Sequence, residues 1–386
     1  MSARLIPLGD VDPDLVAGWR RLSQVALEPN VFAEADFVLA AHRRLGLSGR
    51  AAIVVCEHEG ELRLVLPVAQ VRHFRRIPVP AVAAWHHPYS FLSTPLVAAH
   101  GPEDSWAEAV AAMRTAAPWA VLEQVGSGGP VASSLARAQA GRGLRVTSLP
   151  LADRFVLRRQ PGRDYLSRLS GNRRGKVRRL RRRLEADVHV DVVDDATPGP
   201  ALERAVDDFL AMEAQGWKGA DGGAMACRPG HADFFREVCQ QFAARGALQL
   251  RALQADGVPI AYQCNLVAGD TLFGFKTTFD ESYRRYSPGV VLLLDTILRF
   301  DADERLTTYD SCIGPGESAV RDLFVDRVEQ ADLLLALSGR LGQAVTSLTP
   351  GVATAYRYAK SLRRATGPGP GPAAAPAAGG ARSATG

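Results

Sequence analysis

The segment Asp270–Glu317 holds the residues of this chain most suited to chemistry. Near its middle, Ser287, Pro288 and Gly289 lead into an apolar helical run. Serine is a favoured capping residue, proline fits the first helical position, and glycine adds no side chain. The free N–H groups and the positive dipole end of such a helix suit a phosphate or pyrophosphate.

The residues before this helix strengthen the prediction. Arg284 and Arg285 add positive charge, and the apolar, aromatic stretch Thr271–Phe279 is typical of a strand. The sequence therefore predicts a strand–loop–helix anion site, which suggests an enzyme that uses a phosphorylated carrier.

The elements that must position this site lie in the second of two expected domains, because 386 residues exceed the usual size of one domain. We expect a first domain over 1–150 and a second over 151–345, then a basic helix over 346–366. A Pro/Gly/Ala tail over 367–386 lacks large apolar residues and is expected to be disordered. Mixed sheets with helices on both sides, an α/β (α+β) fold, are the simplest packing.

Local patterns predict a hairpin in the first domain, with strands 51–57 and 62–71 around a Gly-containing turn. No catalytic constellation is found there. In the second domain a long basic helix is expected over 164–186. Further helices and strands are expected at 201–213, 231–244, 248–254, 259–266, 271–279 and 307–312.

The net charge of +5 is local rather than general. Residues 357–386 carry five cations and no acid, so the rest of the chain is neutral. Within that rest, Arg168–Arg183 holds nine cations and no acid. This distribution does not predict a general DNA-binding surface.

Composition also indicates the cellular compartment and whether a metal site is expected. The five cysteines are odd in number without a Cys-x-x-Cys spacing, which argues against disulfides or zinc and for a reducing cytoplasm. The histidines lack ligand spacing, so no metal is expected. The N-terminus lacks the apolar centre of a signal peptide, and no apolar run is long enough to span a bilayer.

The basic helix predicts an anionic partner over Arg173–Arg183. Leu180 and Leu184 belong to an apolar stripe that packs inward, and the arginines cover much of the remaining surface. CoA phosphates, an acidic glycan or lipid headgroup, and tRNA phosphates are all candidates. Between Val352 and Arg364, tyrosines among basic residues make a peripheral contact with the inner membrane surface a further candidate.

Several motifs in one order resemble a known family. These are the stretch DYLSRLSGNRRGKVRRLRRRLEAD, Gly-Trp-Lys-Gly at 216–219, the stretch DGVPIAYQCNLVAGDTLFGFKTTFDESYRRYSPG, and Asp310 with Gly314 and Glu317. Residues 155–325 resemble the acetyltransferase domain of the CelD-like family of cellulose and exopolysaccharide biosynthesis. That family belongs to the GNAT superfamily and is related to FemAB-type transferases. The first 150 residues are similar in layout to the degenerate GNAT-like half of such proteins.

The sequence also departs from this family. Glu317 is followed by Ser-Ala-Val-Arg321 instead of an aromatic-Lys step, and Arg285-Tyr-Ser-Pro-Gly stands where the phosphate loop would be.

The resemblance implies acyl-CoA as co-substrate, lying along the 271–279 strand. Its pyrophosphate would lie at Ser287–Val290, beside Arg285 and Gly289. An amine then attacks the thioester, and this needs a proton acceptor, a polarised carbonyl and a donor to the thiolate.

Candidate residues for these tasks are assigned by position. Asp310 would face the amine as a base, or close its strand as an Asx turn. Glu213 would be a second base, and Tyr286 a donor to the thiolate or a packed loop residue. For substrate contacts the candidates are Trp217, Lys218 and Lys276, with packing or surface exposure as the alternatives.

The leading hypothesis is an acyl-CoA-dependent N-acetyltransferase acting on a small amine in envelope or exopolysaccharide synthesis. The first alternative is a FemAB-like transferase that takes an aminoacyl group from charged tRNA, gripped by the basic helix. The second is a non-catalytic polysaccharide-assembly factor with a decayed site.

Overall fold

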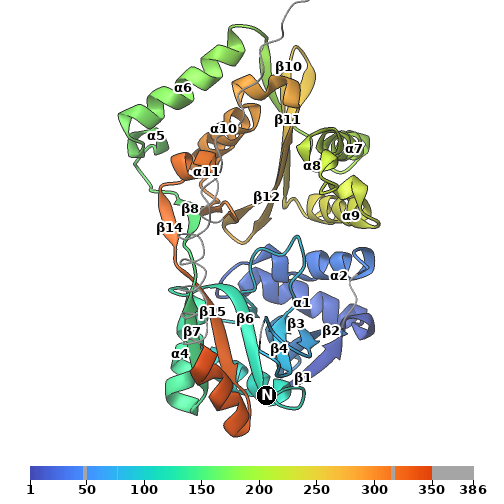
Figure 1. The fold of residues 1–386 in the computed structure, drawn as a ribbon, viewed down its shortest axis with the longest axis vertical. Coiled ribbons are helices and arrows are strands. Elements are labelled where there is room, and N and C mark those ends of the chain that lie inside the picture. Colours follow the sequence, from blue (N-terminus) through green and yellow to red (C-terminus); the bar gives the residue numbers. More distant parts are fainter. Residues whose placement is uncertain (47–49, 76, 314–317, 350–386) are drawn as a thin grey trace, which may run out of the picture. The chain divides into compact units, whose positions relative to one another are not determined.

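The computed structural model describes residues 1–46, 50–75, 77–313 and 318–349. The chain forms two mixed β-sheets, each flanked by helices (Figure 1). This confirms the predicted α/β fold class. Met1–Thr346 forms one compact unit, separate from the segment that begins at Ser347. Of the predicted 346–366 helix only 346–349 is described, and it is helical.

The first sheet has the strand order β1-β2-β3-β4-β6-β15-β7, with β5 paired to β3. Its pairs are antiparallel except for β4 and β6, which are parallel. Its strands are β1 (Ser2–Pro7), β2 (Arg50–His58), β3 (Glu61–Val71), β4 (Ala81–Ala84), β5 (Leu96–Val97), β6 (Trp119–Gly126), β7 (Arg145–Pro150) and β15 (Gln330–Ala336).

The second sheet has the strand order β14-β8-β13-β12-β11-β10-β9, and its one parallel pair is β12 with β13. Its strands are β8 (Arg154–Arg158), β9 (Val190–Asp194), β10 (Leu248–Ala255), β11 (Val258–Ala268), β12 (Thr271–Phe279), β13 (Thr308–Asp310) and β14 (Asp326–Val328).

Helices α6 and α10 lie on one side of the second sheet, and α7 and α9 lie on the other (Figure 1). The α-helices are α1 (Pro13–Val25), α2 (Ala35–Arg44), α3 (Pro102–Met113), α4 (Pro130–Arg142), α5 (Tyr165–Arg168), α6 (Gly171–Glu185), α7 (Pro200–Gln215), α8 (Trp217–Ala220), α9 (His231–Ala244), α10 (Pro288–Ala302) and α11 (Ser318–Leu323). The 3₁₀ helices are η1 (Leu8–Asp10), η2 (Val31–Ala33), η3 (Met225–Cys227) and η4 (Glu281–Tyr286).

The sheets are not strictly sequential in the chain. The predicted domain boundary at residue 150 lies in the connection between β7 and β8. However, β15 belongs to the first sheet, where it pairs with both β6 and β7. The predicted 151–345 domain therefore contributes a strand to the sheet of the predicted 1–150 domain.

Local sequence explains several boundaries. The predicted hairpin is confirmed: Glu59 and Gly60 both take positive φ, 53° and 76°, as a two-residue hairpin turn requires. The single long helix predicted over 164–186 is wrong. It breaks after α5, because the Ser170 side chain accepts the Arg173 N–H and starts α6 afresh.

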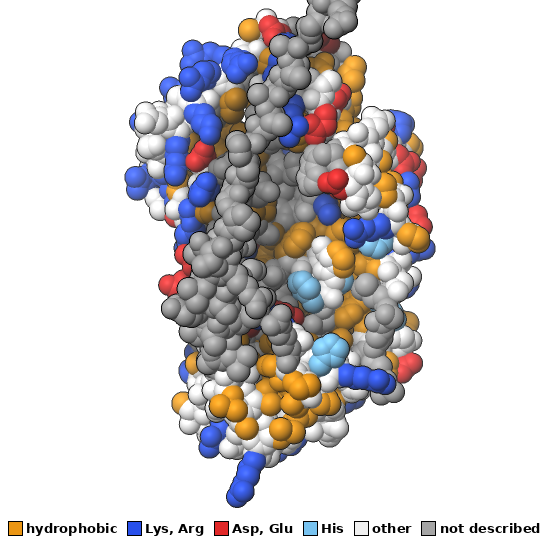
Figure 2. Space-filling model, viewed as in Figure 1, with side chains coloured by type: hydrophobic (Ala, Val, Ile, Leu, Met, Phe, Trp, Pro, Cys, Tyr) orange, Lys and Arg blue, Asp and Glu red, His pale blue; other side chains and the backbone are white. Residues whose placement is uncertain are grey.

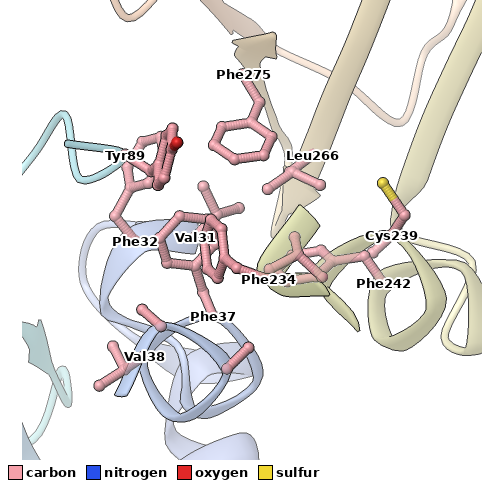
Figure 3. Packing of buried hydrophobic residues seen from close by; sticks show 14 of the residues in the cluster. Val31, Phe32, Phe37, Val38, Tyr89, Phe234, Cys239, Phe242, Leu266 and Phe275 are labelled. Carbon is pink, nitrogen blue, oxygen red and sulfur yellow. The ribbon is translucent and has the colours of Figure 1, made fainter. Parts of the chain in front are cut away.

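One apolar core joins the first sheet's helices α1 and α2 to the second sheet's α7 and α9. Figure 3 shows Phe37 of α2, Phe234 of α9 and Phe275 of β12 meeting there, with Tyr89 of the β4–β5 loop beside them. The ring centroids of Tyr89 and Phe234 are 5.1 Å apart and stacked. Because this core is continuous, side chains from the first sheet's loops, such as Tyr89, contact side chains of the second sheet.

The start of α9 packs tightly against the end of α2. Gly230 has φ 77°, and a Cβ atom there would lie 1.9 Å from the Arg44 carbonyl oxygen. Only glycine fits this approach without movement of the backbone.

Candidate functional site

Parallel strands β12 and β13 part shortly after they begin to pair. Their register runs from Thr271 opposite Thr308 to Phe273 opposite Asp310. Beyond Phe273, β12 continues to Phe279, and no described strand pairs with that edge. An unpaired strand edge offers a row of N–H and C=O groups to an extended ligand.

A β-bulge explains why the strands part at this point. The register of β11 against β12 shifts between Cys264 and Asn265, opposite Gly274–Lys276, and a bulge bends the strand that carries it. Gly274 approaches β13 closely here, since an added Cβ would lie 3.0 Å from the Ser311 carbonyl oxygen.

The far end of β12 lies beside both the start of α10 and the predicted residue Glu213. A Cβ atom on Gly289 would lie 3.8 Å from side-chain atoms of Thr277 and Phe279. The Lys218 ammonium donates to the Thr277 carbonyl at 2.9 Å and to Glu213 Oε1 at 3.2 Å. Glu213 and Lys218 also line a small cavity of about 30 Å³ at this strand end. Gly289 and Lys218 thus both lie beside Thr277, at the end of β12.

The start of α10 differs from the expected cap. Ser287 occupies the N-cap position, but its backbone is left-handed, with φ 53° and ψ 56°, and its side chain makes no capping hydrogen bond. The predicted side-chain cap is wrong because the preceding loop is itself a 3₁₀ helix, η4, that ends on Ser287. The Val290 N–H donates to the Ser287 carbonyl at 2.9 Å, which reduces the donor capacity left for an anion.

Lys276 of β12 meets two side chains that the sequence did not single out. Its ammonium lies over the Tyr89 ring, 4.5 Å from the centroid. Tyr89 Oη lies 2.6 Å from Nδ1 of His231, the first residue of α9. Tyr89 comes from the first sheet's β4–β5 loop, so this cluster combines both sheets.

Burial sets the protonation of these groups. It lowers the pKa of Lys276 to about 8 and raises the pKa of Tyr89 to about 12. The His231 pKa falls through burial and the positive charges of Arg228 and Lys276. At neutral pH Tyr89 is therefore protonated and donates its hydrogen bond to a neutral His231.

Asp310 takes part in a buried ion pair. Arg154 Nε lies 2.8 Å from both carboxylate oxygens, and the Cys312 N–H donates to one of them at 2.8 Å. The carboxylate therefore forms an Asx turn after β13 and joins β13 to β8. These contacts are those of a structural carboxylate, and a role as base remains a prediction.

Tyr286 lies on the other side of the sheet, in the cluster between α6 and α10. Its hydroxyl donates to Asp187 and accepts from Arg285, and the hydrogen bond to Asp187 raises the Tyr286 pKa. The Arg285 guanidinium stacks over the Tyr286 ring at 4.5 Å. The structure does not bring Tyr286, Asp310 and Glu213 into one cluster.

Some predicted features lie outside the description. These are the Trp217 side chain, Gly314, Glu317, the segment Val352–Arg364 and the tail over 367–386. In the described part of the chain no group of His, Cys, Asp or Glu side chains could hold a metal ion. None of the described helices is long and apolar enough to cross a membrane.

Tyr89 and His231 were missed because sequence separation hides them. They are 142 residues apart, and no spacing rule links them. The available signal was the loop between β4 and β5, where Trp85, His86, His87 and Tyr89 follow one another closely.

β12 and β13 are the two parallel strands of a mixed sheet and part next to the start of α10, and this arrangement lies within the segment that matches a family model. Residues 171–318 match the family model described as acetyltransferase (GNAT) domain. The superfamily named from the sequence is thereby confirmed for this segment. The narrower CelD-like assignment remains a prediction.

Solved structures extend the likeness to most of the chain. FemX superimposes with a TM-score of 0.56 at 8% identity, covering 86% of this chain and 98% of its own. The C-terminal domain of a putative lysylphosphatidylglycerol synthetase from Agrobacterium fabrum gives 0.52 at 14% identity, covering 85% and 93%. A protein of unknown function from Bacteroides thetaiotaomicron gives 0.53 at 12% identity, covering 83% and 97%. A comparison with curated proteins finds no match. At these identities the likeness concerns the fold.

Proposed function

We propose that this protein is an N-acyltransferase that moves an acyl group, acetyl in the simplest case, from acyl-CoA to an amine acceptor. The observation that carries the proposal is the unpaired edge of β12 beyond Phe273, with the start of α10 at its far end. The extended arm of the carrier can hydrogen-bond this edge as an added strand would. Its pyrophosphate would then lie near Gly289 and the Lys218 ammonium.

Tyr89 and His231 are placed to remove the proton of the attacking amine. As the C–N bond forms and the C–S bond breaks, the amine proton passes to Tyr89 Oη. The proton of that hydroxyl passes to His231 Nδ1, 2.6 Å away. The thiolate leaves with the electron pair of the C–S bond and takes up a proton from the medium.

The other predicted residues support this geometry. Glu213, which is almost fully buried, fixes the Lys218 ammonium at the end of β12. Asp310 ties β13 to β8, where the two parallel strands part. In line with the CelD-like resemblance, we place the acceptor in envelope or exopolysaccharide biosynthesis.

Calorimetric titration with acetyl-CoA, longer acyl-CoAs and free CoA tests the carrier site. Gly289→Glu places a carboxylate where the pyrophosphate is expected, so CoA binding should be lost. Gly141→Glu on α4 is the matched control, because a Cβ there meets open space. Absence of binding by the unaltered protein, or equal binding by Gly289→Glu, contradicts the proposal.

A second candidate, transfer of an aminoacyl group from charged tRNA, is favoured by the surface of α6. Three of the nine cations in Arg168–Arg183 have a carboxylate within 4.0 Å. The others have none among the described residues, and Figure 2 shows Lys and Arg side chains gathered over this part of the molecule. Arginine forks suit phosphate oxygens. The cations without a described carboxylate partner are Arg173, Arg174, Arg178, Arg179, Arg182 and Arg183.

Reversing two exposed charges of α6 tests this candidate. Arg178→Glu with Arg182→Glu should weaken the retention of tRNA and make the remaining retention less dependent on salt. Arg21→Glu, at an exposed position of α1, is the control. Activity that ribonuclease abolishes supports the tRNA route. Tight CoA binding without tRNA retention rejects it.

A further inference from the structure

Lys276 is a half-buried cation without a described counter-ion. The contact that the structure gives its ammonium is the face of the Tyr89 ring, 4.5 Å from the centroid. Among the described residues, no carboxylate lies within ion-pair distance of the Lys276 ammonium. No described acceptor lies within hydrogen-bond distance of it either. A cation removed from water without a partner is costly, so such a position is favourable only if a ligand supplies the missing charge.

The charges around Lys276 are unbalanced. Lys218 and Arg228 repel its ammonium, while Glu213 attracts it. Glu213 is already engaged, since it pairs with Lys218 and accepts the Met225 N–H at 2.9 Å. Arg228 is exposed, and its guanidinium donates to the Gly222 carbonyl rather than to an acid. The cluster therefore has an excess of positive charge.

We infer that Lys276, with Arg228 at the exposed rim, binds an anionic group, a carboxylate or a phosphate, on the acceptor molecule. A molecule held there has its neighbouring amine beside the Tyr89 hydroxyl, because the Lys276 ammonium lies over the same ring. The acceptor is accordingly an amine that also carries a negative charge. This inference rests on the proposed function for one point, which is that the bound molecule is the amine acceptor.

A general-base role for Lys276 would give different kinetics. A base acts on the chemical step, so its loss lowers kcat. An anion-binding lysine acts on recognition, so its loss raises the acceptor KM while kcat changes little. Arginine cannot replace a lysine base but keeps the positive charge, which makes Lys276→Arg the variant that separates the two roles.

The experiment uses the full chain, which has only four lysines. Reductive methylation with ¹³C-formaldehyde labels them and keeps their charge. Lys276→Met assigns the resonance of interest. Inorganic phosphate and acetate are the anionic probes, with sodium chloride at equal ionic strength and methylamine as controls.

We expect phosphate or acetate to shift the Lys276 resonance and raise its titration midpoint, while sodium chloride and methylamine cause no such change. Above pH 8 the anion affinity should fall about tenfold for each pH unit, because the charged fraction of the free lysine falls by that factor. Lys276→Met should raise the acceptor KM at least about tenfold, and Lys276→Arg should restore it.

Several outcomes overturn the inference. A Lys276 resonance that moves equally with chloride shows no specific anion site. Displacement of phosphate from Lys276 by acyl-CoA assigns the site to the carrier instead of the acceptor. If anions bind at Lys276 but calorimetry detects no acyl-CoA, the proposed function fails while the anion site itself stands.

Discussion

Tyr89→Phe is the most direct test of the proton path. The substitution deletes one hydroxyl and keeps the ring that stacks on Phe234 with centroids 5.1 Å apart. The Lys276 ammonium keeps its aromatic partner. What is lost is the 2.6 Å contact between Tyr89 Oη and His231 Nδ1.

The expected magnitudes differ between stability and catalysis. Losing one partly buried hydrogen bond costs about 1 kcal/mol of unfolding free energy, which leaves the protein folded. Losing the proton acceptor should lower kcat by roughly 10²- to 10³-fold, the ordinary contribution of general acid–base catalysis. His231→Gln should cost about as much. The double variant should cost little more than either, because both residues act in one path.

The assay is thiol release from acetyl-CoA in the presence of the amine found by acceptor screening. Tyr262→Phe is the matched control, since Tyr262 is a buried tyrosine of β11 whose hydroxyl lies 3.5 Å from Asp208. The unaltered enzyme should lose activity as pH falls through the lowered pKa of His231, where the imidazole becomes charged. Tyr89→Phe with kcat within about twofold of the unaltered enzyme refutes the relay.

Three further predictions concern structural residues. Asp310→Asn should destabilise the fold by about 3–5 kcal/mol, as expected when one partner of a buried ion pair is removed; denaturant unfolding that matches the unaltered protein, together with lost activity, would instead support Asp310 as a base. Burial lowers the pKa of His87 to about 3, so His87 stays neutral in the folded protein at pH values where it becomes charged in the unfolded chain. The folded protein is therefore most stable, with respect to His87, above pH 6.5, and it loses stability as the pH falls below that value. From pH 6.5 to 5 the stability of His87→Leu should therefore rise by about 2 kcal/mol relative to the unaltered protein, and a constant difference would contradict this. Gly230→Ala should destabilise by more than 2 kcal/mol through its clash with Arg44, whereas Gly246→Ala, with similar φ and open space, should cost only about 1 kcal/mol in thermal unfolding.

Much of the fold could be predicted because its signals are local. The strand 271–279 and the helix 231–244 have the predicted bounds, since alternation, glycine turns and helical periodicity act within a few residues. The α5–α6 break was equally local, because Ser170 is a favoured helix-capping residue just before α6. The Ser287 cap failed for a different reason, because the turn between η4 and α10 imposes a left-handed backbone.

The site was predictable only in part. Contacts between residues close in sequence could be predicted, and contacts between distant residues could not. Glu213 near the end of α7 and Lys218 on the short helix α8 are five residues apart, so their pairing follows from local geometry. The contact of Lys276 with Tyr89 forms only when both sheets are folded and the β4–β5 loop of the first sheet packs against β12 of the second. No composition or spacing rule contains that information.

The first sheet has a direct part in the proposed chemistry, and the packing explains how it is kept in place. Arg43 and Arg44 at the end of α2 both pair with Glu237 of α9, while the start of the same helix carries His231. Helix α9 is thus held at one end by glycine packing and along its length by ion pairs and shared aromatic core. This rigidity keeps the Tyr89–His231 contact short, which a proton path requires. Loss of docking between α2 and α9 should therefore lower activity even when the β12 edge is unchanged.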